Sequence, residues 1–473
     1  MSGQSRRSFL RMALLGSAAA AVAACQPKIV EVPKEVVKEV EKVVKETVIV
    51  EGTPKIVEKV VVEQAPQEPV LVQWYDYDIT TNFPQELVQA FMKVHPEIEV
   101  EVVGTAGGYY DKLQTILAAG MAPDLMNYQS WRWQPYAKKG VLKPLDDLIA
   151  RDNWTVPFSD RWASTWDPQI KMQGKIYAQP HNTAAMLMFY VKQPFDELGL
   201  PYPTADWTFE DFKELALKMT FEKDGIKHYG FQADNIYERL ASWMRINGQK
   251  EWDTEIEPRQ ALWTQNTIVD MLQFQLYDCY HTLKVSPTPA DMQGGTSQIQ
   301  TGQTAMKYEG CWFLDQMQGP SAAVTGGVPF DVVPMPKGTA GAKHMGFGHI
   351  QAMSATTREE DAAFTLLKYI GDEEGQTIFI ENTGRQPNNP DFNERIWVPR
   401  AMQKYNFQNG QAFIDCMDTG VVHVVGLNDL TLNTDIFYPF RDAAIAGDAT
   451  VPELIEGVND ALQVMCDEYW AEA

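Results

Sequence analysis

The chain has 473 residues, of which 45% are hydrophobic, and its formal net charge is −23. This acidic balance argues against a nucleic acid as partner, because phosphate groups need a basic surface. It also argues against binding of the protein body to an anionic membrane surface. The residues after position 67 are too many for one hydrophobic core, so we expect two or more domains.

The first 24 residues have the pattern of an export signal. Arg6 and Arg7 precede a short apolar run, Met12 to Ala24, which ends in small residues before Cys25. The run is shorter than the roughly 20 residues that a membrane-spanning helix needs. The paired arginines resemble a twin-arginine signal, and Val-Ala-Ala-Cys resembles the lipobox of bacterial lipoproteins. We therefore expect residues 1–24 to be removed.

Lipidation of Cys25 would anchor the mature protein outside the bacterial cell membrane without spanning it. The alternative is an ordinary signal peptide that happens to end at a cysteine. Residues 25–67 repeat Val, Lys and Glu and contain no aromatic residue. Their β-branched residues and prolines disfavour a stable helix. We expect a tether and leave open whether it is a coil, a transient helix or a weak coiled coil.

The body of the chain alternates strand and helix patterns. These patterns predict strands at 70–75, 98–103 and 124–127, helices at 84–94 and 109–119, and a further helix that ends at Lys139. The alternation has the spacing of βαβ units, so we expect a parallel sheet covered by helices.

Four cysteines follow the tether, Cys279, Cys311, Cys416 and Cys466, and none forms a C-x-x-C pair. A zinc site or a redox pair is therefore unsupported, and the seven histidines show no ligand spacing. Buried free thiols are the favoured interpretation, and one or two disulfides stay open. We expect neither a metal nor a cofactor.

Short motifs recur along residues 69–473. They include Pro96-x-Ile98-x-Val100, Ala118-Ala119-Gly120-x-x-Pro123-Asp124, Gly174-Lys175-Ile176-Tyr177, Thr301-Gly302-Gln303-Thr304-Ala305-Met306, Gly346-Phe347-Gly348 and Gly384-Arg385-x-Pro387. In order and spacing these motifs resemble the extracellular solute-binding proteins, specifically the sugar-binding group related to maltose-binding protein.

The resemblance implies an α/β, two-lobed, periplasmic-binding-protein-like fold of type II. Each lobe would hold a mixed, mostly parallel sheet flanked by helices, with the ligand in the cleft between the lobes. Lobe 1 would take residues 69–180 plus 345–385, and lobe 2 residues 181–340 plus 386–473. The function implied is that of a monomeric substrate-binding lipoprotein, which captures a mono- or oligosaccharide and delivers it to the membrane permease of an ABC importer.

A saccharide cleft needs aromatic faces for the sugar rings and planar polar groups for the hydroxyls. Loops that combine both kinds of side chain nominate Trp74, Tyr75, Tyr109, Gln129, Trp131, Arg132, His181, Asn182, Asn235, Tyr237 and Trp243. The resemblance adds Trp312, Phe347, Gly348, Arg385, Phe437 and Tyr438. Phe437 stands where the family has a tryptophan, which argues against maltodextrin as the ligand.

Three alternatives stay open. The same fold could bind a non-sugar solute such as glycerol-phosphate, a peptide or a polyamine. An exported carbohydrate-active enzyme would need two carboxylates across a cleft, whose separation the sequence does not show. A purely structural surface lipoprotein would bind no ligand. The sequence has no nucleophile elbow, zinc-protease motif or phosphate-binding loop, so we expect a protein that is not an enzyme.

Substitution Cys25→Ser tests the predicted anchor. We expect the variant to accumulate as an uncleaved precursor of lower gel mobility, because lipidation of the cysteine sulfur precedes cleavage. Incorporation of labelled palmitate should disappear with it. The matched change Cys279→Ser should be processed like the parent, and normal cleavage of Cys25→Ser would contradict the lipoprotein prediction.

Overall fold

The computed structural model describes residues 39–50, 53–64, 68–105, 107–292, 298–318, 327–422, 426–427 and 431–471. The chain divides into two compact units, residues 1–68 and 69–473. The predicted signal and Cys25 lie outside the described residues. Across the described part of the chain, no helix is both long and apolar enough to cross a membrane.

Within the first unit, the predicted tether contains a β-hairpin. Strands β1 (Glu39–Val50) and β2 (Thr53–Gln64) pair antiparallel along their whole length. The coil, helix or coiled coil considered for this segment is therefore wrong for these residues. The reason is the abundance of valine, whose branched side chain suits a pleated strand better than a helix.

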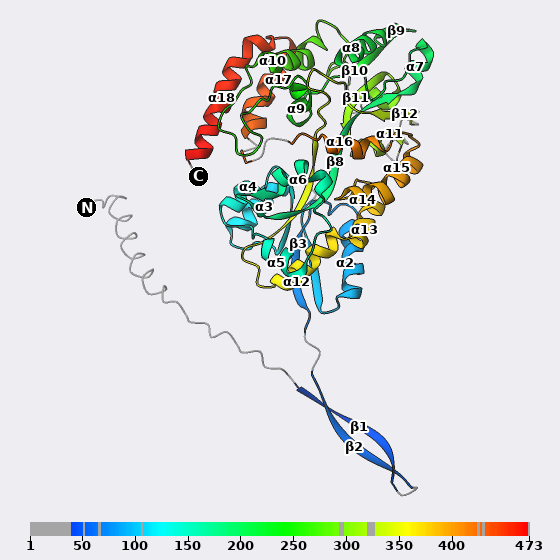
Figure 1. Ribbon diagram of the computed structural model, residues 1–473, viewed down its shortest axis with the longest axis vertical. Helices are drawn as coiled ribbons and strands as arrows, with labels where there is room; N and C mark the ends of the chain where they lie inside the picture. Colours follow the sequence, from blue (N-terminus) through cyan, green and yellow to red (C-terminus); the bar gives the residue numbers. More distant parts are fainter. Residues whose placement is uncertain are drawn as a thin grey trace, which may run out of the picture. The chain divides into compact units, whose positions relative to one another are not determined.

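The second unit is built on one mixed sheet with strand order β4-β3-β5-β13-β8-β11-β10-β9, in which β12 also pairs with β8. The central strand β8 (Ala178–Val191) runs through both halves of this unit (Figure 1). Its residues 178–185 pair with β13, and its residues 186–191 pair with β11 and β12. We call the half that contains β13 the first lobe and the half that contains β11 the second lobe.

The first lobe surrounds the parallel strands β3, β4 and β5. Its elements are β3 (Val70–Tyr75), β4 (Ile98–Val103), β5 (Leu125–Gln129), β13 (Gly346–Met353), α2 (Phe83–Val94), α3 (Tyr109–Ala118), α4 (Gln134–Lys138), α5 (Asp146–Asp152), α6 (Ala163–Ile170), α12 (Glu360–Gly371) and α13 (Glu373–Thr383). The predicted strands and helices of this lobe are confirmed to within two residues at most ends. Val94, the last residue of α2, is 56% exposed.

The second lobe surrounds the parallel pair β10 and β11. Its elements are β9 (Phe221–Lys223), β10 (Ile226–Gln232), β11 (Thr304–Gly310), β12 (Phe330–Val333), α7 (Lys192–Leu198), α8 (Phe209–Lys218), α9 (Tyr237–Arg245), α10 (Asn266–Gln273), α11 (Leu314–Gln318), α17 (Tyr438–Ala446) and α18 (Val451–Ala471). The α/β prediction is confirmed. Strand β3 pairs parallel with β4 and β5, and β10 pairs parallel with β11. The edge strand β9 pairs antiparallel with β10, and β8 pairs antiparallel with all its neighbours.

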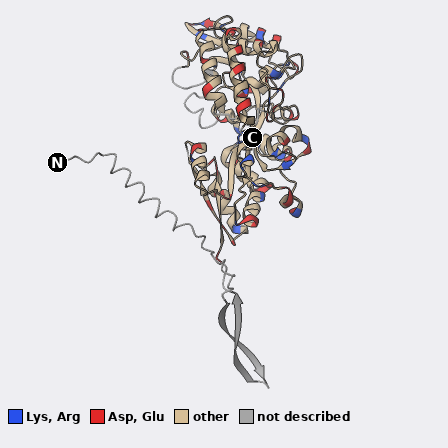
Figure 2. Ribbon diagram, turned by 90° about the vertical axis from the view of Figure 1, so that its left-hand side faces the viewer, with Lys and Arg blue, Asp and Glu red and all other residues tan. Residues whose placement is uncertain are grey.

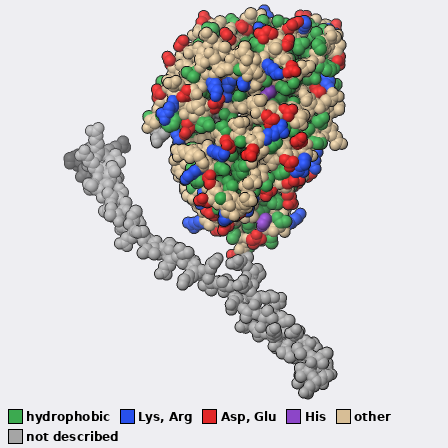
Figure 3. Space-filling view, in the orientation of Figure 1, with side chains coloured by type: hydrophobic (Ala, Val, Ile, Leu, Met, Phe, Trp, Pro, Cys, Tyr) green, Lys and Arg blue, Asp and Glu red, His purple; other side chains and the backbone are tan. Residues whose placement is uncertain are grey.

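A third group of helices lies beside β8: α14 (Pro390–Phe392), α15 (Val398–Tyr405) and α16 (Ala412–Asp418). Helix α16 contacts β8 and α6, and α15 contacts α11, so this group touches both lobes. Acidic and basic side chains lie interspersed over the helices and over the face of the molecule seen in the space-filling view (Figures 2 and 3). The predicted boundaries between the lobes stay predictions.

The side chains of β8 alternate between two hydrophobic cores. Met186, Met188 and Tyr190 face the core of the second lobe, whereas Leu187 and Phe189 face a core shared with α16. Successive side chains of a strand point to opposite faces, so a single strand contributes to both cores. The four cysteines of the body, Cys279, Cys311, Cys416 and Cys466, are buried free thiols, as the sequence favoured.

We expect Phe189→Ala to lower the free energy of unfolding by about 3 to 5 kcal/mol, the usual cost of emptying a phenyl-sized core site. Phe189 is fully buried and packs its ring against Phe313, Phe330 and Phe413. Urea denaturation of the whole chain measures the change. The control Leu217→Ala, at a 47% exposed position of α8, should cost less than about 1 kcal/mol. Equal effects of the two changes would contradict the central role of β8.

Candidate ligand-binding site

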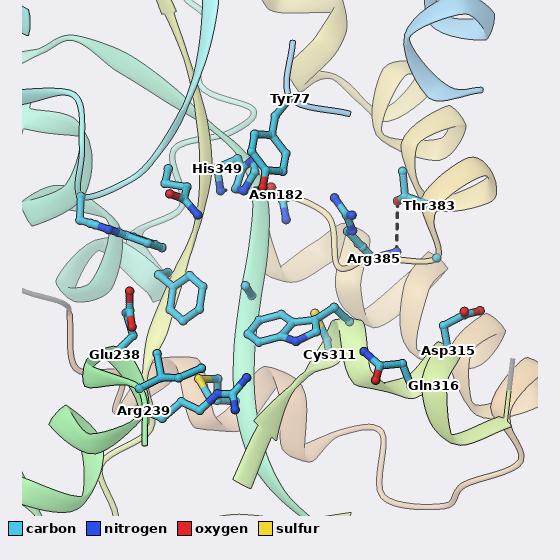
Figure 4. A pocket seen from close by; sticks show the side chains of 18 of the residues that line it. Tyr77, Asn182, Glu238, Arg239, Cys311, Asp315, Gln316, His349, Thr383 and Arg385 are labelled. Carbon is cyan, nitrogen blue, oxygen red and sulfur yellow. Dashed lines mark hydrogen bonds between the residues drawn. The ribbon is translucent and has the colours of Figure 1, made fainter. Parts of the chain in front are cut away.

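A cavity of about 590 Å³ lies where β8 passes from one lobe to the other. This volume falls within the range of small-molecule sites. Both lobes contribute to its walls: the first through β5, β13 and the residues after α13, the second through the start of α9 and the residues after β11. In Figure 4, Tyr77, His349 and Asn182 lie on one side of the cavity, and Glu238 and Arg239 on the other.

Strand alternation selects the residues of the cavity floor. Asn182, Ala184 and Met186 of β8 line the cavity at every second position, as do Phe347 and His349 of β13. This is the expected spacing for side chains on one face of a sheet.

Three aromatic rings of the lining contact one another, with Phe347 edge-on to Trp131 at 90° and tilted by 42° to Trp312, and we call this cluster the platform. The Phe347 ring lies 5.1 Å from Trp131 and 5.7 Å from Trp312, measured between ring centroids. Gly310, directly before the turn that carries Trp312, is essential for this placement. A Cβ atom at position 310 would lie 2.1 Å from the Trp312 indole, so a larger residue would displace the ring.

A buried carboxylate orients Arg385. Its Nη1 donates to Asp78 Oδ1 at 2.7 Å, and Asp78 is only 3% exposed. The backbone N–H of Arg385 also donates to Thr383 Oγ1, shown as a dashed line in Figure 4. Behind this pair, Asp76 accepts a hydrogen bond from the Asp78 backbone N–H. Burial, with the nearby charge of Asp78, raises the pKa of Asp76 to about 7.

Arg239, on the second lobe, is also ion-paired. Its guanidinium lies 2.6 Å from Glu309 Oε1, and Lys307 contacts the other oxygen of the same carboxylate at 3.0 Å. Each cavity arginine therefore has a buried carboxylate beside it. Two further carboxyl groups, those of Glu238 and Asp315, line the cavity directly.

Three side chains of the lining also carry a buried polar atom without a hydrogen-bond partner in the described part of the protein. These atoms are Gln129 Oε1, His349 Nδ1 and Glu238 Oε2. Burial, and secondarily the charge of Arg385, lower the pKa of His349 to about 3. Its imidazole is therefore neutral near pH 7 and offers one donor and one acceptor. Buried polar atoms normally have a hydrogen-bond partner, so these three are exceptions within the described residues.

The structure brings six of the residues predicted from the sequence to the cavity: Gln129, Trp131, Asn182, Trp312, Phe347 and Arg385. They come from five separate stretches of the chain in both lobes. Their role in binding a ligand stays a prediction.

Other predicted site residues of the first lobe lie away from the cavity. Trp74 packs against Phe83 and donates to Gln351, whereas Tyr75 and Tyr109 bond to each other's backbone oxygens. His181 is fully buried and lies 4.9 Å from the ring of Phe379.

Trp74 and Tyr75 do not line the cavity because they lie inside a buried strand. The chain reaches the cavity two residues later, at Tyr77. Arg132 lies over the ring of Tyr110 and is not in the lining. Gly348 has a packing role, because a Cβ there would lie 1.9 Å from the backbone oxygen of Asn182.

The remaining predicted residues are part of the second lobe's interior or surface. Trp243 is fully buried and donates to Asp234, and Tyr237 is fully buried and donates to Glu251. Phe437 is 1% exposed in the same core. Asn235 and Tyr438 both contact Arg441 outside the cavity. The rings of Trp243, Tyr237 and Phe437 therefore stabilise the core of the second lobe, which is the commoner use of large aromatic side chains.

Sequence reasoning missed thirteen lining residues: Tyr77, Ala184, Met186, Ile236, Glu238, Arg239, Cys311, Asp315, Gln316, His349, Thr383, Gly384 and Tyr405. Two of these residues could have been predicted from the sequence. Tyr77 follows a predicted strand, and His349 is two positions from Phe347 on the same face. Glu238 and Arg239 become neighbours of the cavity through the packing of α9, which no local pattern shows.

Comparisons with known proteins agree with this geometry. The model of the bacterial extracellular solute-binding protein family matches residues 77–377. A maltotriose-binding protein of Pyrococcus abyssi is 23% identical over 60% of this chain. The curated relatives that the chain matches are covered over only 40% to 58% of their own length.

Solved structures of similar fold cover nearly the whole second unit. An ABC substrate-binding protein of Listeria monocytogenes, in complex with cycloalternan, is 25% identical with a TM-score of 0.68, over 83% of this chain and 98% of that one. UgpB of Mycobacterium tuberculosis, in complex with glycerophosphocholine, is 18% identical with a TM-score of 0.68, over 85% and 99%. These likenesses confirm the two-lobed type II fold. The chain therefore belongs to the bacterial extracellular solute-binding protein family.

Proposed function

We propose that the protein binds a mono- or oligosaccharide in the cavity between its lobes and delivers it to the membrane permease of an ABC importer. The observation that carries this proposal is the aromatic platform of Trp131, Phe347 and Trp312 beside the polar side chains of Asn182 and Arg385. Sugar rings pack their C–H faces on aromatic surfaces, and their hydroxyl groups need planar donors and acceptors around the rim.

The charges of the cavity favour a neutral ligand. Arg385 and Arg239 each have a buried carboxylate partner, Asp78 and Glu309. An anionic sugar would therefore gain less from these arginines than from unpaired ones, and it would lie near the carboxyl groups of the lining. The guanidinium groups keep N–H donors for neutral hydroxyls.

The known ligands of similar proteins support a saccharide without naming one. The relative from Pyrococcus abyssi is a maltotriose-binding protein, and the Listeria structure holds cycloalternan. The Mycobacterium structure holds glycerophosphocholine, so glycerol-phosphate compounds are the second candidate class.

The membrane anchor, twin-arginine export and monomeric state are parts of the same proposal. They rest on the sequence of residues 1–67 and on the family, whose members are extracellular solute-binding proteins. A receptor tethered through Cys25 would hold its cavity near a permease.

We also propose that the protein catalyses no reaction. Release of shorter sugars from an oligosaccharide incubated with the whole chain would contradict this statement.

A thermal-shift screen of the whole chain tests the proposed ligand class. We expect one group of saccharides to raise the melting temperature, because a ligand at 100 times its dissociation constant adds about 2.7 kcal/mol to stability. Glycerophosphodiesters, peptides and polyamines serve as comparison compounds. A response confined to one of these would retain the solute-binding role and reject the saccharide. No response to any compound would favour a structural lipoprotein.

Trp312→Ala should weaken binding of the identified saccharide by about tenfold, the effect of removing one stacking ring. Isothermal titration calorimetry measures the change. The control Tyr202→Ala removes an aromatic ring that is 40% exposed and does not line the cavity, and it should leave the affinity unchanged. Equal affinities of parent and Trp312→Ala would contradict the role of the platform.

Protonation of His349 should change the affinity by less than about twofold between pH 5 and pH 8, apart from any change caused by Asp76, whose pKa is raised to about 7. Because the pKa of His349 is lowered to about 3, its imidazole gains a proton only well below this range. Calorimetric titrations at several pH values in buffers of equal ionic strength measure the profile. A loss of affinity centred near pH 6.5, the value of an ordinary histidine, that disappears in His349→Asn would show that His349 is protonated in the free protein.

A further inference from the structure

Lys138, the last residue of α4 in the first lobe, reaches across to the second lobe. Its Nζ lies 2.9 Å from Glu257 Oε1. The same ammonium group lies 4.0 Å from the ring centroid of Tyr469 and 4.7 Å from that of Trp470, both at the end of α18. Glu257, Tyr469 and Trp470 thus surround one cation of the opposite lobe, and we call them the cage.

The second lobe assembles this cage from its own contacts. Tyr469 donates its hydroxyl to Glu257 Oε1 at 2.9 Å, and Trp470 Nε1 donates to the backbone oxygen of Pro258 at 2.9 Å. The guanidinium carbon of Arg259 lies over the Trp470 ring, 3.7 Å from its centroid. The cage is therefore held in shape independently of Lys138.

The backbone at Glu257 also has an unusual conformation. Glu257 has a φ of 47°, in the left-handed region that residues with a side chain seldom adopt. Gly426 packs directly against it, and a Cβ atom at position 426 would lie 2.9 Å from Glu257 Cγ. Strained positions of this kind persist where the surrounding structure holds them, and they are common at functional contacts.

We propose that Lys138 and the cage form an interlobe clasp, which stabilises the arrangement of lobes that creates the cavity and slows the release of its ligand. The effect on release rests on the proposed function, whereas the effect on lobe arrangement does not. An ammonium group between two rings and a carboxylate gains both cation–π and ionic attraction. Lys138 and Glu257 are 21% and 19% exposed, so solvent screens this pair less than the freely exposed pairs of the surface.

The consequence follows from the linkage between conformation and affinity. A contact that exists in one lobe arrangement and not in a wider one shifts the equilibrium between them by its own free energy. If the ligand binds the narrower arrangement, loss of the contact lowers the apparent affinity by the same factor. We expect a factor of about five for loss of this partly buried cation–π and ionic contact.

The test uses Lys138→Met, which keeps the aliphatic stem and removes the charge. The control is Lys139→Met, the same change at the exposed neighbouring residue. Spin labels at Asp147→Cys in α5 and Glu210→Cys in α8, both exposed, report the distance between the lobes in a Cys25→Ser background. We expect Lys138→Met to broaden the distribution toward longer distances without ligand, and Lys139→Met to match the parent.

Stopped-flow release of the bound saccharide provides the second measurement. Lys138→Met should release it about five times faster, with little change in the association rate. Tyr469→Phe removes one hydroxyl and should act in the same direction more weakly, while keeping the fold. Unchanged distances between the spin labels in both Lys138→Met and Tyr469→Phe would overturn the clasp. Altered distances without any saccharide binding would retain the clasp and reject the proposed function.

Discussion

The structure depends on one strand that belongs to both lobes. All fourteen residues of β8 are buried, and each lobe completes its sheet by hydrogen bonding to a different part of this strand. Neither lobe can therefore be removed without exposing half of β8. Backbone amide and carbonyl groups deprived of such partners cost as much as lost hydrogen bonds, so the strand ties the two lobes together.

The cavity follows from this shared strand. Asn182, Ala184 and Met186 point from one face of β8 at the place where the pairing partner changes from β13 to β11. Pairing with β13 ends at Ala185 and pairing with β11 begins at Met186, and side chains of both lobes line the cavity at this point.

The polar groups of the cavity are held before any ligand arrives. Asp78 orients Arg385 from the first lobe, and Glu309 orients Arg239 from the second. A site whose hydrogen-bonding groups are already positioned loses less conformational entropy when it binds. The same charge pairing lets an acidic protein place two arginines, Arg239 and Arg385, beside its cavity.

The sequence predicted the architecture well because local patterns carry that information. The strand at Val70–Tyr75 and the helix that begins near Tyr109 follow directly from apolar periodicity and glycine signals. The conformation of the tether was not predicted. A coil, a transient helix or a weak coiled coil was expected, whereas valine's preference for strands gives a pair of antiparallel strands, 39–50 and 53–64.

The site was predictable only in part. Trp312 carried a local signal, a preceding glycine that makes room for its indole. Trp243 and Phe437 have the same aromatic character but lie in the core of the second lobe, and only tertiary packing separates the two cases. Glu238 and Arg239 line the cavity because the first turn of α9 lies at its wall, a placement that depends on residues far away in the chain.

A crystal structure of the whole chain with its preferred saccharide tests the central claim most directly. The account predicts that one sugar ring packs on the platform of Trp131, Phe347 and Trp312, with hydroxyl groups within hydrogen-bond distance of Asn182, His349 and Arg385. A saccharide bound elsewhere on the protein, or one that leaves the aromatic platform untouched, would contradict it.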